Sequence, residues 1–278
     1  MAHASNVLAR SGDLSTGRGY PTRHALPRIL QGVPDPFSAL TALDGVPSAF
    51  AATRDGLDSL LRDRGLRRST PEMTADSLLL GAAASAAIDG AAYDPDGLRR
   101  GEADPLALAA ARMTTELLSL VPTWQTAPLQ AIARIHALVA RGRVDDDALG
   151  RPVSADGATR LGTLAQAVVT PTQAPGLLVA AVVHAEIATA RAFASDNGIV
   201  ARAAERLVLV AKGVDPASLT VPEAGHRAAG AGYPKLLAEY ESDGTAGVHR
   251  WLLYAAQAYA DGAEAAPVDP PKGPRRRA

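Results

Sequence analysis

The chain has 278 residues, of which 47% are hydrophobic, so it can bury a sizeable core in one large domain or two small ones. Its net charge of −1 argues against a general nucleic-acid binder, and the absence of cysteine excludes disulfides and thiolate metal sites, as suits a reducing cytoplasm. Residues 1–19 are polar, and the longest apolar run, Leu177–Val183, is far shorter than the ~20 residues of a membrane span. We therefore predict a cytoplasmic protein that binds neither nucleic acid nor membrane.

The first segment of the chain differs in composition from the rest. Residues 1–45 mix Gly, Pro, Ser and Arg without periodicity, which predicts a poorly ordered arm with short packed pieces. From residue 46 to residue 264 the sequence is predicted to form the main domain. Its first helix is expected over 48–64, where apolar residues recur at helical spacing, and Gly65 is a plausible stop.

The next predicted helix has the clearest start. Thr70 can cap its N-terminus, and Pro71 suits the first helical position. Glu72 follows where the helix dipole favours negative charge. This helix should run from Pro71 to about Ile88, before Gly90.

Five further segments rich in alanine and leucine are predicted helices, several of them apolar on more than one face: 104–120, 127–141, 174–190, 198–212 and 245–262. Between 144 and 172 the composition changes to Gly, Asp, Pro and short β-branched runs, which predicts a loop or small β-hairpin. The predicted fold class is mainly α with that hairpin. Residues 265–278, with four prolines and three consecutive arginines, are predicted to be a disordered basic tail, with a binding arm as the alternative.

The most informative segment lies between two of these helices. Residues 191–202 read RAFASDNGIVAR. They resemble the active-site loop of the Fic family, whose pattern is HPFxxGNGRxxR with an acidic residue just before GNG. The positions that keep the register of this pattern are Phe193, Asn197, Gly198 and Arg202. The resemblance covers roughly residues 50–260 and implies a Fic-like helical domain.

The same comparison shows what the loop lacks. Arg191 stands where the family has the histidine that takes the proton from the attacking hydroxyl, and a guanidinium stays protonated. As a permanent cation, Arg191 either binds phosphate or carboxylate, or pairs with Asp196 or Glu186. Ser195 replaces the acid and cannot hold Mg²⁺ as a carboxylate would. Two other positions differ from the family pattern, Ala192 for proline and Ile199 for the first arginine.

Part of a phosphate site remains. A loop before a helix binds anions because its backbone N–H groups are free and the helix dipole is positive there. Asp196 replaces a glycine and adds negative charge, although Asp tolerates the left-handed region. Arg202 matches the family arginine that reaches the nucleotide phosphates. The candidate nucleotide or phosphate ligands are Arg191, Ser195, Asp196, Asn197, Gly198 and Arg202.

A second motif lies upstream, at the end of the helix predicted for 71–88. Ser85, Asp89 and Gly90 in SAAIDG resemble the inhibitory pattern (S/T)xxxE(G/N) of many Fic proteins, with Asp in place of Glu. The resemblance implies an inhibitory-type helix over about 71–90 and an ion pair between Asp89 and Arg202. The alternative is an ordinary helix-ending turn. The resemblance also implies that the hairpin over about 144–172 is a flap through which a protein target or partner docks.

The histidines do not suggest a metal site. All six lack the i, i+4 pairing or the carboxylate spacing of a zinc site, so no metal is predicted. His184 precedes Arg191 by two helical turns, ~10 Å along the axis, so it cannot replace the missing base. We predict a packed, hydrogen-bonded role for His184, an ordinary polar helix position for Glu186, and a solvated turn at 145–147.

Three hypotheses of function arise from these observations. The first is a degenerate Fic-like protein that has lost most or all adenylyl transfer from ATP to protein hydroxyls and acts as a binding or regulatory module. ATP and Mg²⁺ are then ligands only if the cleft still functions. The second is an active transferase of the same fold that holds another phosphate-containing donor between Arg191 and Arg202. The third is a structural homo-oligomer of apolar helices.

Overall fold

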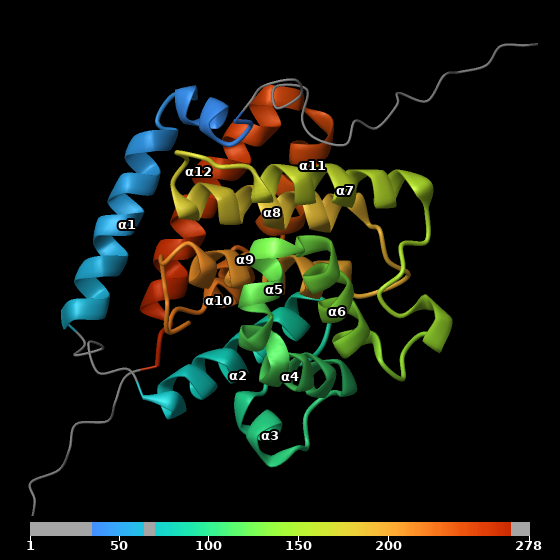
Figure 1. Ribbon diagram of the computed structural model, residues 1–278. Helices are drawn as coiled ribbons and strands as arrows, with labels where there is room; N and C mark the ends of the chain where they lie inside the picture. Colours follow the sequence, from blue (N-terminus) through green and yellow to red (C-terminus); the bar gives the residue numbers. More distant parts are fainter. Residues whose placement is uncertain (1–34, 64–69, 268–278) are drawn as a thin grey trace, which may run out of the picture.

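The apolar helices predicted from the sequence form the centre of the structure. A computed structural model describes residues 35–63 and 70–267, and its α-helices are shown in Figure 1. They are, in chain order, α1 Val46–Asp63, α2 Pro71–Ile88, α3 Pro95–Arg100, α4 Pro105–Leu117, α5 Val121–Thr126, α6 Pro128–Ala140, α7 Ala155–Val169, α8 Gly176–Ala190, α9 Asn197–Ala211, α10 Pro222–Ala228, α11 Gly232–Ser242 and α12 Gly244–Glu264. The short 3-10 helices are η2 Ser38–Ala42, η4 Leu118–Leu120 and η5 Asp146–Ala148.

Two helices form the middle of the molecule. Figure 1 shows α8 and α9 side by side, with the other helices around them. All residues of α8 except Gly176 and Ala188 are buried, as expected of a helix that is apolar on every face. The helices α7, α11 and α12 contact α8, whereas α2, α4, α5 and α6 contact α9. The loop that joins α8 to α9 is therefore held by rigid elements on both sides.

The helix predicted over 71–88 is confirmed as α2. The Thr70 side chain accepts a hydrogen bond from the backbone N–H of Met73 at 3.3 Å, and Pro71 occupies the first turn. Asp89 caps the C-terminal end, and Gly90 follows with φ of 103°, a conformation that favours glycine. α2 packs on α4, α9 and α10, and its C-terminal cap Asp89 lies beside Gly198 in the first turn of α9.

The predicted β-hairpin is wrong. Within the described residues there is no strand, only an isolated bridge between Arg141 and Val144, and most of 144–172 is taken up by η5 and α7. The β-branched residues at the end of α7 suggested a strand, but Leu161, Leu164 and Val168 are spaced for one helical face and are buried. Tertiary packing of that face overrides local β-propensity.

Several predictions fall partly or wholly outside the described residues. These are most of the N-terminal arm, at 1–34, the stop at Gly65, and the basic tail from 268 onward. In the described part of the arm, Phe37 and Leu40 are buried in the core. Of the helices in the described ranges, none is long and apolar enough to cross a membrane.

Candidate functional site

The loop between α8 and α9 keeps a tight turn. Asp196 adopts φ of 57° and ψ of 17°, which is the left-handed conformation that the missing glycine would take easily. The Asn197 side chain closes the loop, since its Oδ1 accepts from the Phe193 N–H at 2.9 Å and its Nδ2 donates to the Phe193 carbonyl at 2.8 Å. The Asp196 carboxylate accepts from Ser195 Oγ at 2.7 Å and pairs with Arg143 at 3.2 Å. The geometry of the turn thus survives the loss of the glycine.

Arg191 points away from the loop. It ends α8 with φ of 44°, and its two terminal nitrogens donate to both carboxylate oxygens of Glu241, at 2.9 and 3.2 Å. The interpretation that Arg191 pairs with Asp196 or Glu186 is therefore wrong. Its partner comes from α11, 50 residues along the chain, which no local pattern could indicate.

Glu186 is not an ordinary polar helix residue. It is buried in α8, where it contacts Arg160 of α7 at 3.3 Å and accepts from the Tyr240 hydroxyl at 2.7 Å. Burial raises the pKa of Glu186 to about 7, although Arg160 and Tyr240 favour its charged form. This cluster anchors α7 and α11 to α8 beside the loop.

Arg202, the last arginine of the family pattern, is buried and bonded to three residues. Its Nε donates to Ser85 Oγ at 2.8 Å, its Nη2 to the Ser85 carbonyl and to Asp89 Oδ1, and its Nη1 to the Tyr233 hydroxyl at 3.1 Å. These four bonds use four of the five N–H donors of the guanidinium, so one N–H donor remains for another partner. The predicted Asp89–Arg202 ion pair is present, at 2.9 Å.

This pair covers the first turn of α9. A Cβ atom added at Gly198 would lie 3.1 Å from Asp89 Oδ1 and 3.1 Å from Arg202 Nη1. The carboxylate therefore sits at the positive end of the α9 dipole, where the resemblance would place a phosphate. Ser85 and Asp89 reach Arg202 from the last turn of α2, while Gly90 lies beyond them in the turn.

His136 is a contact of the loop that the sequence did not single out. Its ring stacks on Phe193 with centroids 4.2 Å apart, and its Nδ1 accepts from the Gly150 N–H at 2.9 Å. The side chain is buried, and burial lowers the pKa of His136 although Asp196 opposes this shift. The sequence resemblance covered these segments, but only the packing brings His136 against Phe193.

The depressed pKa of His136 predicts how stability depends on pH. A histidine kept neutral in the folded state binds fewer protons than in the unfolded state, so stability falls as pH drops below its ordinary pKa of 6.5. The free energy of unfolding in urea, measured at several pH values, should fall less for His136→Asn than for the wild type. His249→Asn is the control, because His249, on α12, is only partly buried. Equal pH dependence in the wild type and His136→Asn would contradict this prediction.

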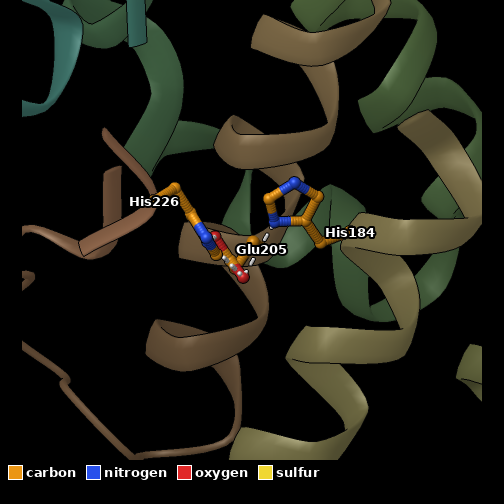
Figure 2. Close-up of side chains that lie close together, drawn as sticks. All are labelled: His184, Glu205 and His226. Atoms are coloured by element: carbon orange, nitrogen blue, oxygen red, sulfur yellow. Dashed lines mark hydrogen bonds and ion pairs between the residues drawn. The ribbon is translucent and has the colours of Figure 1, made fainter. Parts of the chain in front are cut away.

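A polar cluster lies in the core behind Arg202. His184 of α8, Glu205 of α9 and His226 of α10 are fully buried, and both imidazole rings turn toward the Glu205 carboxylate (Figure 2). His184 Nε2 lies 2.8 Å from the Tyr233 hydroxyl, so the predicted packed role of His184 is confirmed. Since its members come from three helices, no spacing along the chain could indicate the cluster.

Comparisons with known proteins identify the fold. No protein-family model matches the chain, and no curated protein matches it. Among solved structures, it is similar to the crystal structure of a Fic family protein from Desulfovibrio desulfuricans G20, with a TM-score of 0.66 and 19% identity. The match covers 81% of this chain and 74% of that one. At this identity the likeness establishes the arrangement of helices and not the chemistry. The chain therefore has a Fic-like fold.

Proposed function

We propose that this Fic-like protein has lost most or all adenylyl transfer and acts as a binding or regulatory module. The observation that carries the proposal is the environment of Arg202. A guanidinium that is 1% exposed and bonded to Ser85, Asp89 and Tyr233 has one N–H donor left for a nucleotide phosphate. To bind a triphosphate, Arg202 would have to leave partners from two other helices.

The loop also lacks the histidine to which the resemblance assigns the role of general base. Arg191 stays protonated and is paired with Glu241, so it accepts no proton from a hydroxyl. His184 is buried behind the loop, and His136 is buried under Phe193 with its Nδ1 already accepting from Gly150. Neither imidazole is exposed to a substrate that enters from solvent.

The electrostatics of the loop also disfavour a phosphate. Two carboxylates, Asp89 and Asp196, lie at the N-terminal end of α9, where a nucleotide would place its own negative charge. At Ile199, where the family has an arginine, the side chain is completely buried. The position has become part of the core, and returning a cation there would bury an unpaired charge.

A partner-binding role suits the surface next to the loop. The residues before α7 run alongside it, and the Val153 N–H donates to the Ala192 carbonyl at 2.8 Å. The Val153 side chain is 60% exposed, so an apolar group is presented beside the turn. A protein partner that docks here would contact the segment that the resemblance assigns to target binding.

Calorimetric titration of ATP, with and without Mg²⁺, tests the loss of nucleotide binding. We expect no saturable heat from the wild type or from Asp89→Asn, because Ser85 and Tyr233 still hold Arg202 when the carboxylate is neutralised. Asp96→Asn is the matched control, since Asp96 forms an exposed pair with Arg99. Saturable binding in Asp89→Asn alone would show an intact cleft under restraint and would contradict the proposal.

Incubation with ATP that carries a radiolabel on its α-phosphate tests the chemistry itself. We expect no labelled chain, either in the wild type or in Asp89→Asn, because the loop lacks the histidine that would take the proton from the attacking hydroxyl. Stoichiometric labelling that disappears in Arg202→Lys would overturn the proposal. A thermal-shift series with other nucleotides and nucleotide sugars extends the same test to a different donor.

A further inference from the structure

We propose that His184, Glu205 and His226 bind a divalent first-row transition metal such as Zn²⁺ in the core of the protein (Figure 2). One nitrogen from each ring and one carboxylate oxygen lie within 4.8 Å of one another. Two imidazoles and a carboxylate are a ligand set that zinc and its neighbours accept. The inference concerns the core and does not depend on whether the loop transfers AMP.

The distances suit one shared ion. His184 Nδ1 lies 3.0 Å from Glu205 Oε1, and His226 Nε2 lies 3.0 Å from Glu205 Oε2. Ligand atoms that are each ~2.1 Å from one zinc ion lie roughly 3.0–3.4 Å apart. The two contacts therefore have the separation of neighbouring ligands, and the ion would join α8, α9 and α10.

The orientation of His184 adds an independent observation. Although Glu205 Oε1 is 3.0 Å away, the buried Nδ1 of His184 has no aligned hydrogen-bond partner among the described residues. A short contact that is poorly aligned for N–H donation is expected in a coordination sphere. There the lone pair points at the ion, and the neighbouring ligand lies to one side. A bound cation would satisfy this otherwise unpaired atom.

Three tyrosine hydroxyls bond to the proposed ligands. The second ring nitrogen of His184 lies 2.8 Å from the Tyr233 hydroxyl, and Tyr254 lies 2.9 Å from the second ring nitrogen of His226. The Tyr259 hydroxyl donates to Glu205 at 2.8 Å. Metal-binding imidazoles characteristically use the other ring nitrogen for a hydrogen bond that fixes the tautomer and the ring orientation.

The negative charge of Glu205 is not balanced by an arginine or lysine among the described residues, so a cation could bind there. Glu205 is fully buried, and among the described residues its carboxylate forms no salt bridge with lysine or arginine. The two arginines nearest to it on α9, Arg202 and Arg206, are already paired with Asp89 and Glu223. A buried carboxylate usually requires a paired cation or a metal.

Metal analysis of the full-length protein, purified without a histidine tag or chelator, tests the site. Because the ligands are enclosed, the chain is unfolded, refolded with Zn²⁺, Co²⁺ or chelator, and desalted. We expect one bound ion per chain, visible Co²⁺ absorption bands of a nitrogen- and oxygen-ligated site, and a higher melting temperature after refolding with Zn²⁺. Absence of stoichiometric metal after refolding with Zn²⁺ would overturn the proposal and leave a network in which both rings donate to Glu205.

Variants assign the ligands. Glu205→Gln and His226→Gln should each abolish stoichiometric binding, whereas His249→Gln should retain it because His249, on α12, lies outside this cluster. Unchanged metal content in either core variant would contradict the assignment. If these variants do not fold, X-ray absorption of the Zn²⁺-loaded wild type decides, since two imidazoles give a scattering pattern that an adventitious carboxylate site lacks.

Discussion

Replacing Arg206 by methionine is expected to lower the free energy of unfolding by about 3–5 kcal/mol. Arg206 is buried in α9 and donates to both oxygens of Glu223, at 2.7 and 3.1 Å. It also donates to Ser77 Oγ, Ser218 Oγ and the Thr220 carbonyl. Without the guanidinium, Glu223 stays in the core as an uncompensated charge. Equilibrium unfolding in urea measures the loss.

Two variants separate the buried pair from charge removal in general. Arg99→Met should cost no more than about 1 kcal/mol, because Arg99 and its partners Asp76 and Asp96 are exposed to solvent. Adding Glu223→Met to Arg206→Met should recover much of the loss, since the stranded carboxylate is then removed. Similar losses for Arg206→Met and Arg99→Met would show that the buried pair does not stabilise the fold.

Gly225→Ala is expected to lower the free energy of unfolding by about 3 kcal/mol or more, at the upper end of the range for overpacking. A Cβ atom at Gly225 in α10 would lie 1.9 Å from the Ala258 carbonyl oxygen of α12 and 2.8 Å from its carbonyl carbon. The obstacle is helix backbone, which cannot rotate away as a flexible side chain would, so the two helices must separate. Urea unfolding and the melting temperature report the change.

The control for Gly225 is a glycine with open space around it. Gly162 lies within α7, and a Cβ atom there would meet nothing within 4 Å. Gly162→Ala should be neutral or stabilise by up to about 1 kcal/mol, because alanine has the higher helix propensity. If Gly225→Ala were as stable as Gly162→Ala, the result would contradict the close contact between the backbones of α10 and α12 at Gly225.

Features that depend on neighbouring residues could be predicted from the sequence. Thr70, predicted as the cap of α2, accepts a hydrogen bond from a backbone N–H three residues away. Periodicity identified most of the long helices, α7 and α11 excepted, because 3.6 residues per turn places their apolar residues on one face. The pairing of Asp89 with Arg202 was predicted from the motif resemblance, whereas any role of that pair in nucleotide binding stays a prediction.

Short helices and contacts between distant segments could not be predicted in this way. α3 and α5 each have six residues, too few for a periodic pattern, and are stable only because the rest of the chain packs on them. The β-hairpin expected over 144–172 does not form, because burial of one face of α7 outweighs the local β-propensity of its β-branched residues.

Composition, caps and periodicity thus determined by themselves that the chain is helical and where the loop and most of the long helices lie, α7 and α11 excepted, since these depend on interactions within a few residues. Only the tertiary structure decided which side chains meet. It paired Arg191 with Glu241, placed His136 on Phe193, and brought His184, Glu205 and His226 together. The physical reason is that partners from separate helices are chosen by how the helices pack, and the packing is settled by the burial of the whole core.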